Sequence, residues 1–274
     1  MIQNKKRSAG MSSQGLRAVS YAQFLKKEVL LLGDIAAGLG ITKVQEMRLL
    51  SRLEGKGQIV RLKRGAYCVP SKPSPSGRLN VSEYFLLSKL MELEGSTYQI
   101  SGPNAFHLYG FDEQVPNRLF VYNDRFSGEK EIGGYAFVFV KTSAERLQGW
   151  IRSTGPDGAK IVMASKPKAL VDAIYDWSRF NTIPRAFEWI IASCHDDPCF
   201  KRELARMAIK CGNKAILRRI GCLLEHNGDS KRSLRFLKKA IGDSKAVIPL
   251  VPRKPKRGQV DSYWGVVIND RITY

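Results

Sequence analysis

The stretch that decides the fold is LLLGDIAAGLGITKVQEMRLLSRLEGKGQIVRLKRGAYCVP, residues 30–70. Gly38 and Gly40 indicate a turn between two short apolar-periodic runs. Thr42 is a good N-cap, and Gln45 three residues later completes the pattern of a capping box. We expect a helix over 42–53, ended by the glycines at 55 and 57, with one buried stripe formed by Val44, Met47, Leu49, Leu50 and Leu53.

The rest of this helix is polar and cationic. Its outward positions are Lys43, Gln45, Arg48 and Arg52, of which the last three share one face by their i, i+3, i+7 spacing. Residues 59–62 and 66–69 read as two short strands around a basic turn that carries Lys63 and Arg64.

A helix, a tight turn, a second helix and a basic hairpin make the outline of a winged helix-turn-helix. Such a helix can enter the major groove, where Arg and Gln read base edges, while a basic hairpin holds phosphates or the minor groove. The alternative is a small helical subdomain whose charged face is only solvated. Because helix and hairpin are cationic together, we favour DNA binding by Lys43, Gln45, Arg48, Arg52, Lys63 and Arg64.

The sequence around this stretch suggests the domain boundaries. Residues 1–18 are polar and basic, and we expect a flexible arm. A first helix capped by Ser20, with Tyr21, Phe24, Leu25 and Val29 on one face, and a second over 32–39 complete a winged helix-turn-helix domain over 19–70. The SKPSPSG segment, residues 71–77, reads as a linker.

Residues 78–274 read as a mixed α/β domain with a helical second half, so the whole chain is expected to be α+β. Apolar helix periodicity marks 81–93, and Pro103 opens a short helix. Strand patterns occupy 98–101, 119–122, 135–141 and 160–164. From Lys166 onward five helices follow, over 166–180, 183–193, 200–210, 214–225 and 230–241, and strands return over 246–251 and 262–268.

The net charge of +20 is concentrated in two blocks. Residues 1–75 carry +10 and residues 201–257 carry +13, whereas residues 76–200 carry −2. Two basic blocks around a near-neutral middle fit a polyanion contacted at two places. No apolar run approaches the ~20 residues that span a bilayer, and the N-terminus does not resemble a signal peptide, so we expect a cytoplasmic protein without membrane attachment. Five cysteines, an odd number, favour reduced thiols over a disulfide framework.

The second basic block raises a possible contact with nucleic acid, RNA included. Its cations lie on two expected helices, where the apolar stripe would leave them on the outer surface. The alternative is again a solvated face. The candidate residues are Arg218, Arg219, Arg232, Arg235, Lys238 and Lys239.

Catalytic and metal sites are weakly indicated. The series Cys194, His195, Cys199, Cys211 and Cys222 lacks the paired C-x2-C spacing of zinc sites. His107 near Ser101 and Asp112 could be placed in a triad only by proximity in sequence. Asp172 and Asp176 share a helix face, but Lys168, Arg179 and solvent are sufficient companions. We therefore expect no enzyme, no cofactor and no metal, and an enzyme built on His107 or the cysteines remains the rival.

Several segments together resemble the AbiEi-type antitoxins of type IV toxin–antitoxin systems. The resemblance covers almost everything after residue 20. It rests on RLKRGAYCVP (61–70), SGPNAFHLYGFDEQVP (101–116), KPKALVDAIYD (166–176), RRIGCLLEHNG (218–228) and WGVVIN (264–269). The wing cations of the family correspond to Lys63 and Arg64, and its recognition helix to residues 42–53.

The resemblance implies an autoregulating repressor whose N-terminal domain binds inverted repeats in double-stranded DNA upstream of its own operon. It also implies a C-terminal domain required for antitoxin action against a nucleotidyltransferase-type toxin, without a stable complex. The basic arm and the charged segment over 230–239 depart from the family, which leaves a stand-alone regulator as an alternative. An RNA- or tRNA-binding protein that uses the C-terminal basic helices is the other.

Overall fold

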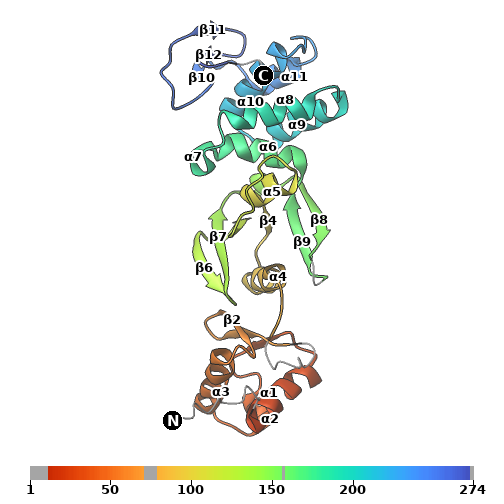
Figure 1. The fold of residues 1–274 in the computed structure, drawn as a ribbon, viewed down its shortest axis with the longest axis vertical. Helices are drawn as coiled ribbons and strands as arrows, with labels where there is room; N and C mark the ends of the chain where they lie inside the picture. Colours follow the sequence, from red (N-terminus) through yellow and green to blue (C-terminus); the bar gives the residue numbers. More distant parts are fainter. Residues whose placement is uncertain (1–11, 71–78, 156–157, 272–274) are drawn as a thin grey trace, which may run out of the picture. The chain divides into compact units, whose positions relative to one another are not determined.

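The computed structural model of the chain describes residues 12–70, 79–155 and 158–271 (Figure 1). Helices and several small sheets make it a mixed α+β protein, as its sequence predicts. The chain divides into two compact units. The first holds the residues up to Ser96 together with 129–137 and 154–161, and the second holds 97–128, 138–153 and the chain from Val162 on. The predicted linker, and the predicted arm up to residue 11, lie outside the described residues.

The first unit begins with the element order of a winged helix-turn-helix. Its three strands form one antiparallel sheet in the order β1-β3-β2. A cluster of buried side chains from the helices and the sheet, Leu30, Ile35 and Leu50 among them, forms its core. The elements are α1 (Ser13–Phe24), β1 (Val29–Leu31), α2 (Ala36–Leu39), α3 (Lys43–Gly55), β2 (Val60–Lys63) and β3 (Ala66–Cys68).

The first helix starts earlier than the sequence suggests. Ser12 is its N-cap, with the Oγ accepting from the backbone N–H of Gly15 at 3.2 Å, so the predicted start at Ser20 is wrong. The predicted arm therefore cannot reach residue 18. The buried face of α1 includes Gly15, Ala18 and Ala22, small residues that a search for bulky apolar side chains overlooks.

A strand replaces the end of the first predicted helix, and the second predicted helix is shorter than expected. Val29 does not lie on the first helix, because α1 ends at Phe24 and Val29–Leu31 pairs with β3 as strand β1. The second helix has only four residues, Ala36–Leu39, rather than residues 32–39. Gly40 ends it in the left-handed conformation, with φ of 63°, which confirms the predicted turn.

The capping box at the start of α3 is confirmed. The Thr42 hydroxyl accepts from the Gln45 N–H at 3.2 Å, and the Gln45 side-chain oxygen accepts from the Thr42 N–H at 2.8 Å. These two bonds satisfy backbone donors that the first helical turn leaves without a partner. Helix α3 therefore begins where the sequence places it.

The predicted buried stripe of α3 is partly wrong. Leu49, Leu50 and Leu53 are buried, but Val44 and Met47 are about half exposed, at 53% and 49%. The remaining buried position of this helix is Glu46, which is fully buried. Spacing of three residues drifts around a helix of 3.6 residues per turn, so Val44 and Met47 leave the face that Leu50 and Leu53 share.

Glu46 joins α3 to the segment that follows β1. One carboxylate oxygen accepts from the N–H of Gly33 at 2.7 Å, and the other accepts from the N–H of Ile35 at 3.1 Å. A buried carboxylate is costly unless it is hydrogen-bonded. Here both oxygens have a backbone donor, and the carboxylate fixes α3 against the short helix that precedes it.

Helix α4 (Glu83–Glu94) belongs to the same unit. Ser82 caps it by accepting from the Phe85 N–H at 3.2 Å. Lys89 forms an ion pair of 2.6 Å with Glu28, and Glu94 forms one of 3.2 Å with Lys63. These pairs connect α4 with residues before β1 and at the end of β2.

A six-stranded sheet has the order β6-β7-β5-β4-β9-β8. At its centre β4 runs antiparallel to β5 and parallel to β9. Its outer strands β6 and β8 are almost entirely exposed and were not predicted, because neither GEKEI nor WIRST alternates as a half-buried strand does. The strands are β4 (Tyr98–Ile100), β5 (Leu119–Asn123), β6 (Gly128–Ile132), β7 (Tyr135–Lys141), β8 (Trp150–Thr154) and β9 (Lys160–Ala164).

The second unit also holds a set of packed helices and a small C-terminal sheet. Helix α6 packs against α8 and α9, and α10 packs against α9 and α11, around one large apolar core. The helices are α5 (Pro103–Leu108), the 3-10 turn η1 (Ala144–Leu147), α6 (Lys166–Tyr175), α7 (Trp177–Phe180), α8 (Arg185–Cys194), α9 (Pro198–Cys211), α10 (Lys214–His226) and α11 (Arg235–Ile241). The last of these starts five residues later than predicted.

The C-terminal strands β10 (Ile248–Pro249), β11 (Gln259–Asp261) and β12 (Val266–Ile268) form a sheet in the order β10-β12-β11. The fully buried Trp264 stands between β11 and β12 and lies on α10 at Gly221. A Cβ at this glycine would come within 2.3 Å of the indole ring. Only glycine therefore allows the tryptophan to approach the helix so closely.

The Glu46 bonds give a test of the N-terminal fold. Replacing Glu46 with Ala leaves two backbone N–H groups without their acceptor, at roughly 1–3 kcal/mol each. We expect Glu46→Ala to lower the free energy of unfolding of the full chain accordingly, measured by urea denaturation with circular dichroism. Ser51→Ala, an exposed position on the same helix, is the matched control. Equal stability of the two variants would contradict the role given to Glu46.

Candidate nucleic-acid interface

A cationic hollow lies in the winged-helix part of the first unit. Its volume is about 970 Å³, and its wall combines residues of α1, α3 and the β2–β3 hairpin. Five of its lining residues are exposed arginines, namely Arg17, Arg48, Arg52, Arg61 and Arg64. The only acidic side chain in the lining is that of Glu54. This concentration of guanidinium groups creates a positive potential suited to a phosphate backbone.

The structure brings together four of the six residues that the sequence predicts for DNA contact. Gln45, Arg48 and Arg52 of α3 and Arg64 of the wing all line the hollow. Lys43 is exposed at the start of α3 but is not in the lining. Most of the residues predicted for DNA contact thus lie on one continuous surface formed by α3 and the wing.

Lys63 is held by other groups. Its Nζ lies 3.2 Å from Glu94 and 3.4 Å from the carbonyl oxygen of Leu93, both at the end of α4. A cation paired with a carboxylate contributes less to a positive surface than a free one. Arg64 is therefore the stronger candidate of the two wing cations.

Sequence reasoning missed Gln14, Arg17 and Arg61. The first two belong to the helix segment that was read as an arm, and Arg17 occupies an exposed position of α1. Gln14 accepts from Arg52 at 3.5 Å, which connects α1 with the recognition helix. Arg61 is the exposed residue of β2 next to the buried Leu62, and this alternation along the strand could have indicated it.

The C-terminal basic residues separate into two groups, and two of the predicted contacts are corrected. Arg218 and Arg219 are buried, with 2% and 7% of their surface exposed. Arg218 donates to the carbonyl oxygens of Trp264 at 2.6 Å and Ser244 at 2.8 Å. Buried guanidinium groups are not available to phosphate, so the predicted outer surface does not include them.

Arg219 acts in the same way one residue later. It donates to the carbonyl oxygens of Leu250 at 3.0 Å and Pro249 at 3.1 Å, and burial lowers its pKa to about 10. The two arginines of α10 thus satisfy carbonyls of the C-terminal segment. The Lys238 ammonium group donates to the carbonyl oxygen of Tyr263. The exposed cations of the predicted set are therefore Arg232, Arg235 and Lys239.

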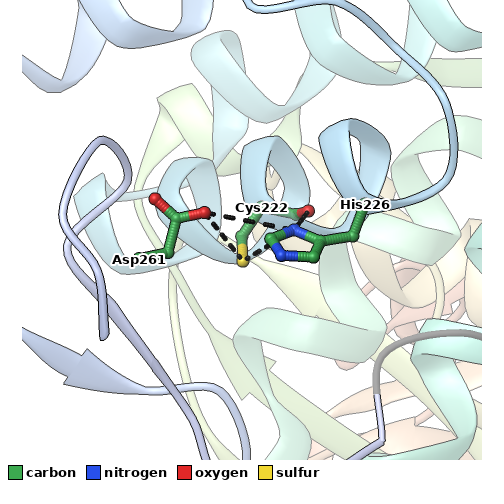
Figure 2. Close-up of side chains that lie close together, drawn as sticks. All are labelled: Cys222, His226 and Asp261. Carbon is green, nitrogen blue, oxygen red and sulfur yellow. Dashed lines mark hydrogen bonds and ion pairs between the residues drawn. The ribbon is translucent and has the colours of Figure 1, made fainter. Parts of the chain in front are cut away.

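The cysteines do not assemble as the zinc alternative requires. Among the described residues, one group of potential metal ligands contains three members, and it comprises Cys222, His226 and Asp261 (Figure 2). The Cys222 Sγ lies 3.8 Å from His226 Nδ1 and 3.9 Å from Asp261 Oδ2. Thiolate, imidazole and carboxylate are ligands that Zn²⁺ accepts.

Two features of this cluster favour a structural role. His226 Nδ1 is 2.9 Å from the carbonyl oxygen of Cys222, and when it donates an N–H to that oxygen only Nε2 keeps a lone pair for a metal. Burial, followed by Asp261 and Glu225, raises the pKa of the Cys222 thiol to about 12. The other oxygen of Asp261 accepts from the N–H groups of Tyr263 and Trp264 at 3.0 and 3.1 Å, which forms the turn before β12.

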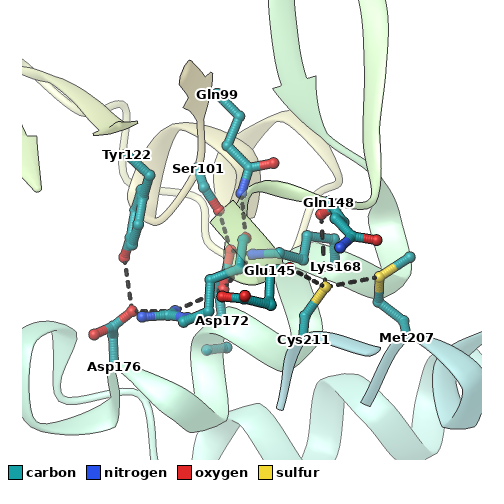
Figure 3. A network of polar contacts seen from close by, with 12 residues as sticks. Gln99, Ser101, Tyr122, Glu145, Gln148, Lys168, Asp172, Asp176, Met207 and Cys211 are labelled. Carbon is teal, nitrogen blue, oxygen red and sulfur yellow. Dashed lines mark hydrogen bonds and ion pairs between the residues drawn. The ribbon is translucent and has the colours of Figure 1, made fainter. Parts of the chain in front are cut away.

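A buried polar network connects α6 with β4, β5 and η1 (Figure 3). Asp172 is fully buried and accepts from Lys168 at 2.5 Å, from Ser101 at 2.7 Å and from Arg146 at 2.9 Å. Arg146 also pairs with Asp176 at 2.8 Å. Of the expected companions, Lys168 is confirmed at Asp172, whereas Arg146 rather than Arg179 is the cation that pairs with both Asp172 and Asp176.

This network also removes Ser101 from the triad considered for His107. The Ser101 hydroxyl donates to Asp172, whereas His107 lies 3.2 Å from the carbonyl oxygen of Asp112. Burial alone would lower the pKa of Arg146, but Asp172 and Asp176 outweigh it and raise that pKa. Burial, with the same two carboxylates, raises the pKa of Tyr122 well above its ordinary value. Both shifts favour a charged Arg146 guanidinium and a neutral Tyr122 phenol.

Thiol reactivity tests the packing of both units. Cys199 is exposed, and the other four cysteines are buried. Burial raises the pKa of Cys68, Cys194 and Cys222 to about 12, so about one in ten thousand of these thiols is ionised at pH 8. We expect iodoacetamide to modify the native protein at Cys199 alone, as read by mass spectrometry. Cys199→Ser should give no fast adduct, and rapid alkylation of Cys222 would contradict the packing.

The buried arginines give a second test. Arg218→Met leaves two carbonyl oxygens without their charged donor, and we expect it to cost about 1.5–3 kcal/mol of folding free energy. Thermal unfolding of the full chain measures the loss. Arg232→Met removes the same charge from an exposed position and should leave the midpoint unchanged. If both variants unfold alike, Arg218 does not hold the C-terminal segment.

Three comparisons with known proteins bear on this arrangement. A family model described as "Transcriptional regulator, AbiEi antitoxin" matches residues 21–70, from α1 to the end of the wing. No curated protein matches the chain. The crystal structure of the Rv2827c protein from Mycobacterium tuberculosis is similar in fold, with a TM-score of 0.57 and 15% identity over 94% of this chain and 92% of that chain.

The family match and the sequence resemblance agree on the same segment. It contains α3, the wing and most of the cationic hollow. The described residues contain no helix long and apolar enough to cross a membrane. Residues 21–70 of this chain thus match the AbiEi antitoxin family of transcriptional regulators.

Proposed function

We propose that the chain is a DNA-binding transcriptional regulator that represses and autoregulates its own operon from inverted repeats, and that it acts in the cytoplasm without catalysing a reaction. The observation that carries this proposal is the hollow between α1, α3 and the wing, whose lining includes five exposed arginines and Gln45. In this proposal α3 enters the major groove, and Arg64 with Arg61 holds the flanking backbone.

The proposal extends to the antitoxin of a type IV pair. The support is the resemblance of the second-unit segments and the family match of the N-terminal segment. The partner would be a nucleotidyltransferase-type toxin opposed without a stable complex. Growth rescue by the full chain, when the toxin encoded beside it is expressed, tests this part. Absence of rescue would leave a stand-alone regulator.

RNA binding is a second candidate function, and fewer residues now support it than the sequence suggested. Since Arg218 and Arg219 are buried, it rests on the exposed Arg232, Arg235 and Lys239 near α11. The triple substitution of these cations with Ser would abolish RNA binding while leaving binding to DNA unchanged. If RNA binding is lost instead when Arg48 and Arg64 are substituted, the winged helix binds both RNA and DNA through one site.

Affinity for DNA, and its dependence on salt, tests the proposed regulator. The full chain should bind the DNA upstream of its own gene more tightly than random DNA, and log affinity should fall with log salt by about 0.9 for each phosphate contacted. Arg48→Ala should cost about 1–3 kcal/mol on the specific DNA if Arg48 reads a base. Fluorescence anisotropy at several salt concentrations measures both quantities.

The wing should behave differently from the helix. Arg64→Ala should weaken binding to specific and random DNA alike and reduce the salt slope by about one phosphate. Arg232→Ala is the matched control, because it removes an exposed arginine from the second unit. Equal and weak binding of the wild type to both DNAs would contradict the proposed regulator.

A further inference from the structure

The recognition helix exposes two apolar side chains beside its cations. Val44 is 53% exposed and Met47 is 49% exposed. Single exposed apolar residues are ordinary on protein surfaces. These two, however, stand at i and i+3, so they lie next to each other on one helix.

The buried residues of α3 define which way this pair points. Glu46, Leu49, Leu50 and Leu53 form the inward face. At about 100° per residue, the direction opposite to that face passes between Val44 and Arg48, with Ser51 close to it and Met47 and Arg52 about 70° to either side. Val44, Arg48 and Ser51 therefore lie outermost, and Met47 extends them into one exposed ridge at i, i+3, i+4 and i+7.

This ridge differs from the predicted reading face. Gln45 and Arg52 lie on the side away from Met47, where the Arg52 guanidinium donates to the side-chain oxygen of Gln14 on α1 at 3.5 Å. Met47 and Arg48 both line the cationic hollow together with Arg64. If α3 lies in the major groove, an approaching duplex would meet Val44 and Arg48 first, with Met47 next to Val44.

The chemistry of the major groove identifies what such a ridge can recognise. Thymine alone among the four bases presents a methyl group there, which apolar side chains contact, whereas arginine pairs with guanine O6 and N7. We propose that Val44 and Met47 contact thymine C5-methyl groups, next to a guanine contacted by Arg48. This specificity rests on the proposed DNA-binding function and names the bases that the ridge selects.

A docking surface for another protein is the competing use of this pair. Two half-exposed side chains surrounded by Lys43, Arg48 and Arg52 make a small apolar area within a cationic field. Stable protein interfaces need a larger buried apolar centre and are depleted of charge there. The surrounding charge therefore favours a polyanion as the ligand.

The test uses uracil as thymine without its methyl group. A binding sequence is first selected by the full-length protein from random duplexes, and each thymine is then replaced singly with uracil. At one or two thymines in each half-site, we expect the wild type to lose about three- to fivefold in affinity, as the removal of one buried methyl group implies. Val44→Ala and Met47→Ala should each abolish the thymine preference at one of these positions.

Three controls make the outcomes distinguishable. Leu16→Ala, which truncates a 55% exposed side chain on α1, should keep the full thymine preference. The two α3 variants should unfold like the wild type, because both positions are exposed. The inference would be overturned if both variants kept the full thymine preference. It would also be overturned if uracil at every position of a selected site left the affinity of the wild type unchanged. Failure to select any sequence would instead overturn the proposed function.

Discussion

The N-terminal unit depends on one buried carboxylate. Glu46 accepts from the N–H groups of Gly33 and Ile35, so it joins the middle of α3 to the chain between β1 and α2. Removing a charge from water is expensive, and these bonds offset that cost only in one arrangement of the helix. With Glu46 inward, the helix must turn Val44, Met47 and Arg48 outward. The interaction that stabilises the unit also determines which side chains the helix presents.

The second unit uses the opposite charge for a similar purpose. Arg218 and Arg219 of α10 donate to four carbonyl oxygens of the C-terminal segment, at Ser244, Pro249, Leu250 and Trp264. Short strands leave many carbonyls without partners, and a planar guanidinium group can satisfy two at once. The small sheet β10-β12-β11 is therefore held by side chains of a helix as well as by its own ladder. Part of the positive charge of this region therefore belongs to buried arginines that donate internal hydrogen bonds, and not to the surface.

Local signals explain what could be predicted from the sequence. The capping box of Thr42 and Gln45, the turn at Gly40 and the start of α6 at Lys166 all depend on residues within a few positions, and all were predicted. Strand β1 and the buried Glu46 depend on partners elsewhere in the chain, namely β3 and the turn after β1, and were missed. The same holds for Arg218 and Arg219, because only the fold brings the C-terminal carbonyls to α10. Charge counts cannot tell a surface cation from a buried one.

This distinction changes how the charge of the chain should be related to function. An electrostatic surface gives affinity for any duplex and strong salt dependence, but it carries no sequence information. Four arginines of the hollow are of this general kind, on α1, α3 and the wing: Arg17, Arg52, Arg61 and Arg64. Discrimination between operators needs groups that contact base edges, and the exposed ridge of α3 offers both Arg48 and two apolar side chains for it. The exposure of Val44 and Met47, unfavourable for folding alone, is what a helix that reads thymine would require.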